Sequence, residues 1–291
     1  MKTFSIAAAR TVALCATIVI AGVCSEPLGA QEGFTNLPGV RLHFTDTGGA
    51  GTPIVFLHAN TGTAESWKYQ IEPFSKAGYR VIAFDRRGWG KSVADPATGS
   101  QPGTVADDLQ ALVDYLNVSK FYVVGVAGGG FVALDYAAWQ PSRVIALVVA
   151  ASTGLVSERE VLDYSARIAI PGFDSQPGTY REISPSYRGS HPDGVLAWAA
   201  IEEHSRQAGA PNQPLRTPNT FAKLESIRAP VLVLAADADL IAPPGLMKAW
   251  AAHVNNGQYD SVPDAGHAVA WERPEIFNER VLRFLRAAQA R

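Results

Sequence analysis

From about residue 34, hydrophobic residues form short runs that are separated by glycine-, proline- and asparagine-rich turns. Two of these runs, 121–126 and 144–152, are apolar throughout. Continuous apolar runs are typical of strands in a parallel sheet that is covered on both faces. The predicted strands in the first half of the chain are 40–47, 53–58, 79–85, 121–126 and 144–152.

Helical patterns alternate with these strands. The segment 104–117 is predicted to be a helix, with Thr104 as its N-cap and Asp107 three residues later. A second helical pattern follows the glycines at 128–130. Strands that alternate with helices predict an α/β fold with an open, mostly parallel central sheet flanked by helices.

The regular alternation stops between residues 153 and 229. This segment is rich in proline and aromatic residues, and only 157–168 and 193–207 have plausible helical patterns. The strand pattern resumes at 230 with "PVLVLAAD", and a further helix, a short strand and a closing helix follow. We therefore expect a core built from 31–152 and 230–291, with 153–229 inserted between two strands as a helical cap or lid.

The N-terminus has the layout of a secretory signal peptide. Lys2 and Arg10 flank its start, the apolar run "TVALCATIVIAGV" follows, and "PLGA" ends at residue 30. We predict a signal peptide over 1–30 with cleavage near Ala30, and a secreted or periplasmic protein; an uncleaved anchor is the alternative. Both cysteines of the chain, Cys15 and Cys24, lie in this segment, so the mature protein would contain no thiol.

Charge and composition narrow the function. The chain has 291 residues, with 27 acidic and 25 basic ones and a formal net charge of −2, which gives no indication of nucleic-acid binding. The histidines show no metal-ligand spacing, so we expect no metal and no cofactor. The expected partner is a small molecule, with no membrane contact after signal cleavage, and the sequence does not indicate an oligomeric state.

Five short motifs carry the chemistry. In chain order they are "FLHANTG" (56–62), "DRRGWGKS" (85–92), "VVGVAGGG" (123–130), "AADADLIAPP" (235–244) and "PDAGHAVAWERP" (263–274). In this order and spacing, residues 34–291 resemble the α/β-hydrolase fold family with a helical cap. "VVGVAGGG" occupies the place of that family's G-x-S-x-G strand–turn–helix corner. "DRRGWGKS" is interpreted as a structural turn beside the site.

The resemblance implies a role for particular residues. Position 127 would carry the nucleophile, but it is alanine rather than the expected serine. Asp239, four residues before Pro243, would be the acid, with Asp237 as the alternative, and His267 would be the base.

The resemblance also implies how the substrate is held. The backbone N–H groups of Asn60 and Gly128 would form the oxyanion hole, although Ala59 replaces the glycine that is usual in this loop. We expect His58, Trp198 and Tyr187 to contact the substrate.

Alanine at position 127 leaves three interpretations. The chain is a nucleophile-less form of a serine hydrolase, it uses His267 directly as a general base in a cofactor-free lyase or oxygenase, or it is a ligand-binding protein on a hydrolase scaffold. In the first interpretation the aromatic cap favours a carboxylic ester or lactone of modest size that is mostly apolar or aromatic, and the chain as written would be nearly inactive. A carbon–carbon bond hydrolase of ring-cleavage products would use the same residue types and is the main rival.

Overall fold

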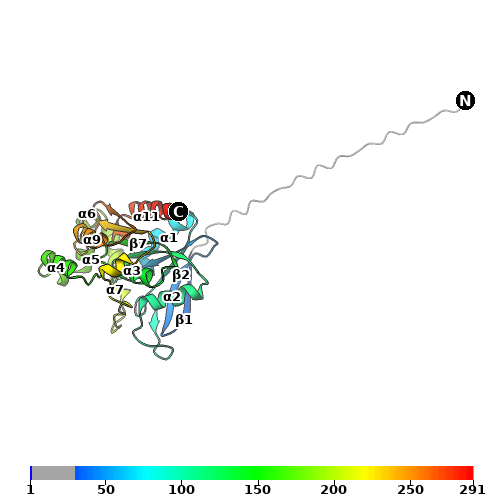
Figure 1. Ribbon diagram of the computed structural model, residues 1–291, viewed down its shortest axis with the longest axis horizontal. Coiled ribbons are helices and arrows are strands. Elements are labelled where there is room, and N and C mark those ends of the chain that lie inside the picture. The colour runs from blue at the N-terminus through cyan, green and yellow to red at the C-terminus, as the bar shows by residue number, and fades with distance from the viewer. Residues whose placement is uncertain (2–29, 291) are drawn as a thin grey trace.

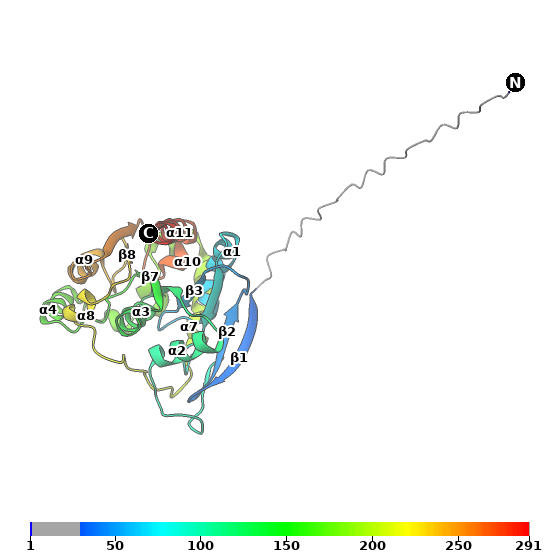
Figure 2. The ribbon, with the colours of Figure 1, turned by 45° about the vertical axis from the view of Figure 1, so that its right-hand side comes forward.

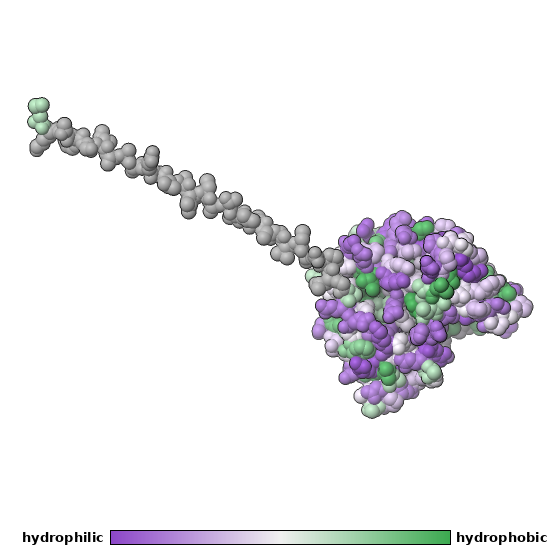
Figure 3. All heavy atoms as spheres, turned by 180° about the vertical axis from the view of Figure 1, so that it is seen from behind, coloured by the Kyte–Doolittle hydropathy of each residue, from purple (hydrophilic) through white to green (hydrophobic). Residues whose placement is uncertain are grey.

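A computed structural model describes Met1 and residues 30–290 (Figure 1). The predicted signal peptide, with Cys15 and Cys24, therefore lies almost entirely outside the described residues. In the part that is described, no helix is both long enough and apolar enough to span a membrane. On the face seen in Figure 3, apolar side chains occur in small groups among polar ones.

The described strands form a nine-stranded sheet. Figures 1 and 2 show this sheet at the centre of the molecule, with helices around it. The main path runs in the spatial order β1-β2-β4-β3-β6-β7-β8-β9, and the short β5 pairs with β2. From β4 to β9 all neighbours are parallel, whereas β2 is antiparallel to β1, β4 and β5. The strands are β1 (Gln31–Leu37), β2 (Val40–Asp46), β3 (Pro53–Leu57), β4 (Arg80–Phe84), β5 (Val93–Ala94), β6 (Phe121–Val126), β7 (Val144–Ala150), β8 (Val231–Ala236) and β9 (Gly257–Val262).

Side chains of the central strands alternate between two hydrophobic cores. In β3, Val55 and Leu57 pack in one core, and Ile54 and Phe56 pack in the other. This follows from the two-residue period of a strand. The first face is covered by α2 (Val105–Tyr115), α3 (Gly128–Trp139) and α9 (Pro244–Ala251), and the second by α1 (Lys68–Lys76), α10 (Val269–Glu272) and α11 (Pro274–Gln289). The predicted α/β architecture, a mostly parallel sheet flanked by helices, is confirmed.

Helices of the core alternate with the strands. Thr104 caps α2 by accepting a hydrogen bond from the backbone N–H of Asp107, at 3.1 Å, as the sequence suggested. The core helices are η1 (Ala64–Trp67), α1 (Lys68–Lys76), α2 (Val105–Tyr115), α3 (Gly128–Trp139), α9 (Pro244–Ala251), α10 (Val269–Glu272) and α11 (Pro274–Gln289).

The segment between β7 and β8 contains a series of helices, of which α7 is the longest with 14 residues. They are α4 (Arg159–Ile168), η2 (Phe173–Ser175), α5 (Gly178–Glu182), α6 (Pro185–Ser190), α7 (Pro192–Ser205) and α8 (Phe221–Glu225). A small apolar cluster of Ile183, Tyr187 and Trp198 from this segment packs on Ala268 and Trp271. We call residues 153–229 the cap, and this cluster joins it to the segment that carries His267.

Candidate active site

The corner between β6 and α3 is tight and holds Ala127 in an unusual conformation. Ala127 has φ 49° and ψ −115°, a region that a side chain makes unfavourable. Glycines on both sides allow the close approach: a Cβ at Gly129 would lie 2.0 Å from the carbonyl oxygen of Leu57, and one at Gly125 would lie 2.4 Å from that of Gly129. The corner therefore has the geometry of a nucleophile elbow, but its side chain is a methyl group, which has neither a lone pair nor an acidic proton.

Asp239 and His267 form a buried hydrogen-bonded pair. Asp239 Oδ2 lies 2.8 Å from His267 Nδ1, and Asp239 Oδ1 accepts hydrogen bonds from the backbone N–H groups of Ile241 and Ala242 at 2.8 and 2.9 Å. Because Asp239 is acceptor-only when ionised, this contact assigns the proton to Nδ1 and leaves Nε2 free to act as a base. Asp237, the alternative acid, is exposed and does not reach the ring.

The environment of His267 favours its protonated form. Burial by itself lowers the pKa, but the charge of Asp239, its hydrogen bond and the charge of Glu182 together raise the pKa of His267 above 6.5. An imidazole that gains a proton readily, held by a carboxylate, is suited to general-base chemistry.

The loop after β3 brings the two predicted oxyanion residues together. A Cβ at Gly128 would lie 2.3 Å from Asn60 Oδ1, so Asn60 lies directly against the start of α3. Arg86 Nη2 donates to Asn60 Oδ1 at 2.9 Å, and Trp89 Nε1 donates to the carbonyl oxygen of Asn60 at 2.7 Å. Gly128 is the first residue of α3, so its N–H has no intrahelical acceptor. The two residues thus meet at the start of α3, and the oxyanion hole formed by their N–H groups stays a prediction.

Ala59, in the usual glycine position, also fits this loop. Its methyl group lines the cavity described below, and Ala59 is not among the described residues with positive φ. Alanine is therefore accommodated here without backbone strain.

The structure does not place His58 against a substrate, and our prediction for this residue requires correction. His58 is fully buried, its Nδ1 donates to the carbonyl oxygen of Ala59 at 2.7 Å, and its Nε2 accepts from the backbone N–H of Arg86 at 3.0 Å. Burial, followed by the charge of Arg86, lowers the pKa of His58 to about 3. His58 is a neutral residue that connects two loops.

The "DRRGWGKS" segment has the structural contacts expected of it. Asp85 accepts hydrogen bonds from the backbone N–H groups of Ala64 and Lys91, and from His43 Nδ1 at 2.8 Å. These bonds fix the turn that places Arg86 and Trp89 against the Asn60 loop.

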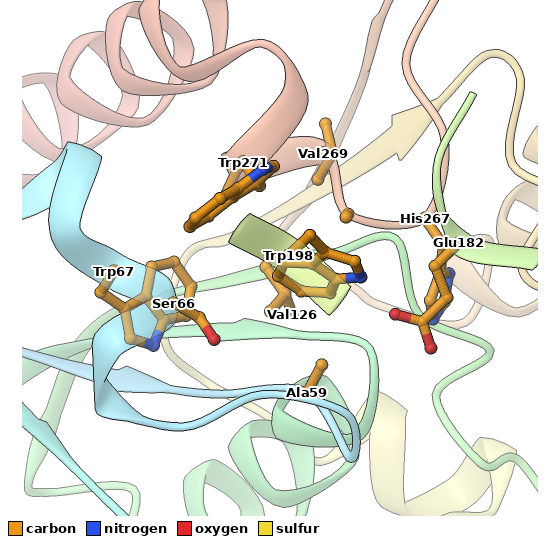
Figure 4. Close-up of a pocket in the computed structure, with 11 residues that line it drawn as sticks. Ala59, Ser66, Trp67, Val126, Glu182, Trp198, His267, Val269 and Trp271 are labelled. Carbon is orange, nitrogen blue, oxygen red and sulfur yellow. The ribbon is translucent and has the colours of Figure 1, made fainter. Parts of the chain in front are cut away.

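A small cavity lies beside the pair (Figure 4). Most of its wall is apolar, and His267 and Glu182 are its ionisable residues. It is lined by Ala59, Ser66, Trp67, Val126, Glu182, Trp198, His267, Ala268, Val269, Ala270 and Trp271. Val126 directly precedes the elbow residue, so the cavity adjoins the corner as well as the base.

Of the two cap residues predicted to contact substrate, Trp198 lines this cavity and Tyr187 does not. Tyr187 is 5% exposed and stacks on His191 with ring centroids 4.6 Å apart. The expectation for Tyr187 is thus corrected, because its ring fills the small core beneath the cap.

Sequence reasoning missed Glu182, at the end of α5. It is 4% exposed, its Oε2 accepts a hydrogen bond from Thr61 Oγ1 at 2.8 Å, and burial raises its pKa. Its backbone carbonyl accepts the N–H of Ala268 at 3.1 Å. Thr61 lies 121 positions away in the sequence, so no local pattern could have indicated the burial of Glu182.

A second buried glutamate, Glu272, fastens the cap to the histidine loop. Its two oxygens accept the backbone N–H groups of Gly266 and Ser184, each at 3.1 Å. Gly266 directly precedes His267, and Ser184 caps α6.

In the described part of the chain, no group of three or more His, Cys, Asp or Glu residues could hold a metal ion.

Known proteins share this architecture. The model of the alpha/beta hydrolase family matches residues 54–280. BpoC of Mycobacterium tuberculosis, provisionally named a non-heme bromoperoxidase, is 30% identical over 84% of this chain and 98% of its own length. A 2-hydroxy-6-oxononadienedioate/2-hydroxy-6-oxononatrienedioate hydrolase of Paraburkholderia phymatum is 29% identical over 90% and 95%. The structure of a thermophilic esterase from Thermogutta terrifontis superposes with a TM-score of 0.73, at 27% identity, covering 89% of this chain and 99% of that one.

Proposed function

The chain belongs to the alpha/beta hydrolase family, and we propose that its site is built to hydrolyse a carboxylic ester or lactone of modest, mostly apolar or aromatic size. The chain with Ala127 is then a nucleophile-less form of a serine-bearing parent, which binds its substrate and leaves it nearly uncleaved. The observation that carries the proposal is the Asp239–His267 pair, which opens onto an aromatic cavity beside an elbow that has no nucleophile.

In the serine-bearing form the hydroxyl at 127 would attack the acyl carbon and pass its proton to His267 Nε2. The carbonyl oxygen would become an oxyanion held by the N–H groups of Asn60 and Gly128. His267 would then protonate the departing alcohol, and water, activated by the same imidazole, would release the acid. Departure of the alcohol leaves the acyl group bonded to the oxygen at 127, and water then cleaves that bond, so every step requires the atom that Ala127 lacks.

The lining of the site supports the proposed substrate class. Trp67, Trp198 and Trp271 form much of its wall, which suits an apolar or aromatic acyl group. A lactone is an internal ester and presents the same acyl carbon.

Carbon–carbon bond hydrolysis is the second candidate. The observation that favours it is the similarity to the Paraburkholderia phymatum hydrolase over nearly the full length of both chains.

In either case we propose that the protein is secreted or periplasmic after cleavage near Ala30, on the basis of the charge and apolar pattern of residues 1–30. N-terminal sequencing of the exported protein tests that site.

The test is restoration of the nucleophile. Ala127→Ser is expected to raise hydrolysis of p-nitrophenyl butyrate by about 10³-fold or more, since loss of a triad nucleophile costs up to about 10⁶ in turnover. Ala127→Gly is the matched control, because it relaxes the backbone without adding a hydroxyl group, and it should give no gain. A folded Ala127→Ser protein with no gain on esters, lactones or ring-cleavage products would rule out the serine-parent interpretation. Turnover by the unaltered chain that depends on His267 would favour the general-base interpretation instead.

A further inference from the structure

Polar groups that the proposed hydrolysis does not use gather at one end of the cavity. Glu182 is buried there with one protein hydrogen bond to its side chain, from Thr61, within the described part of the chain. Trp198 Nε1 is also buried, and among the described residues it has no hydrogen-bond partner. Figure 4 shows the indole nitrogen of Trp198 on the side of its ring that faces Glu182 and His267. A buried donor without an acceptor costs free energy. A ligand atom that accepts a hydrogen bond from the indole N–H would remove this cost.

The two groups require complementary partners. The indole N–H can only donate, and the carboxyl group of Glu182 accepts when ionised and also donates when protonated. A ligand hydroxyl satisfies both, because its oxygen accepts from the indole while its hydrogen is donated to the carboxylate. When Glu182 is protonated, the hydroxyl oxygen can accept from it as well. An ether or carbonyl oxygen would give an ionised Glu182 no donor beyond the hydroxyl of Thr61.

An ammonium group is a poorer match as the ligand, because it can only donate and would leave the indole N–H of Trp198 without an acceptor. A neutral group that both donates and accepts is the better match.

The position of His267 sets how far the hydroxyl lies from the reacting bond. His267 belongs both to the Asp239 pair and to the cavity wall that contains Glu182 and Trp198. A hydroxyl bound there lies close to the carbonyl group on which His267 would act.

We propose that Glu182 and Trp198 form a subsite for a substrate hydroxyl group one or two carbons from the scissile carbonyl, so that the preferred substrate is a hydroxy ester or hydroxy lactone. This inference rests on the proposed function for the identity of the carbonyl, but the subsite can be tested by binding alone. Because the unaltered chain would leave an ester intact, its affinity can be measured directly.

The experiment is a ligand-observed NMR titration of the full chain with methyl butyrate, methyl 2-hydroxybutyrate and methyl 3-hydroxybutyrate. At least one hydroxylated ester should bind about tenfold more tightly than methyl butyrate. Trp198→Phe, which keeps a ring but removes the N–H, and Glu182→Leu should each remove most of that preference while affinity for methyl butyrate changes little. Glu202→Gln is the matched control: Glu202 is another cap glutamate whose pKa is raised by burial, but it does not line the cavity, and the preference should persist.

Two outcomes would overturn the subsite. One is equal binding of all three esters by the unaltered chain, and the other is a preference that survives in a folded Trp198→Phe and a folded Glu182→Leu protein. Hydrolysis by Ala127→Ser separates this inference from the proposed function. A hydroxyl preference without any gain of hydrolysis would retain the subsite and reject the hydrolase, whereas a gain of hydrolysis without the preference would reject the subsite alone.

Discussion

Asp239, and not Asp237, faces His267: Oδ2 of Asp239 lies 2.8 Å from Nδ1 of the imidazole, while the side chain of Asp237 is exposed. The two carboxylates are separated by one residue at the end of the same strand. They differ because the turn after β8 donates two backbone N–H groups to Asp239 Oδ1 and so aims its other oxygen at the ring.

This difference predicts unequal effects of two similar substitutions. In the Ala127→Ser background, Asp239→Asn should lower kcat by about 10⁴, because an amide favours the wrong tautomer of the base. Asp237→Asn should leave kcat nearly unchanged. Steady-state hydrolysis of p-nitrophenyl butyrate measures both, and the reverse ranking would identify Asp237 as the acid.

The pKa values of His267 and His58 should be shifted in opposite directions. His267 has a raised pKa, so in the unaltered chain its imidazole is expected to lose its proton above pH 6.5, and Asp239→Asn should move that midpoint to lower pH. His58 should remain neutral down to about pH 3. Imidazole ¹⁵N chemical shifts recorded across pH 3–9 report both groups in one sample.

The raised pKa of His267 links pH to the rate of hydrolysis and to the stability of the folded protein. Since the base must be neutral, hydrolysis by Ala127→Ser should rise as pH increases through the raised pKa of His267. The stabilisation from that proton is present below the unfolded value of about 6.5 and is lost as pH rises through the folded value. An acid limb of the rate profile that is centred below pH 6.5 would contradict this assignment.

Glu272 is expected to contribute to the stability of the folded protein. Glu272→Ala leaves the buried N–H groups of Gly266 and Ser184 without acceptors, which costs about 1–3 kcal/mol for each unpaired group. Glu275→Ala, three residues later at an exposed position, should change the free energy of unfolding by less than about 0.5 kcal/mol. Urea denaturation compares the two, and equal losses would show that the bridge contributes nothing.

Substitution of a glycine in the elbow by alanine should destabilise the protein far more than the same substitution at an open position. Gly129→Ala would place a methyl group 2.0 Å from the carbonyl oxygen of Leu57, where neither backbone can yield, so we expect a loss of more than about 3 kcal/mol or insoluble protein. Gly189→Ala on α6 meets no heavy atom within 4 Å and should be neutral or slightly stabilising. Thermal melting curves of both variants test the contrast.

The sequence predicted the elements whose residues carry their own signal. Strands such as Val231–Ala236 are apolar throughout and were found, whereas β1, "QEGFTNL", was not expected, because only Thr35 and Leu37 of it are buried. Its pairing depends on β2, which no local pattern shows.

The site was predictable in outline only. Asp239 and His267 could be proposed from their motifs, and the spacing to Pro243 already favoured Asp239 over Asp237; the turn geometry explains why. His58 was misinterpreted because its partner, the N–H of Arg86, is 28 positions away. Glu182 was missed because its burial arises from cap contacts with the Thr61 loop and Ala268.

Glu182 and Glu272 join the cap to the chain on either side of His267. A displacement of the cap would break the bonds from Ala268 to Glu182 and from Ser184 to Glu272, and would so free the chain next to His267, while the bond of the imidazole to Asp239 lies outside the cap. Entry of a ligand and the positioning of the chain around His267 would then be coupled through the cap.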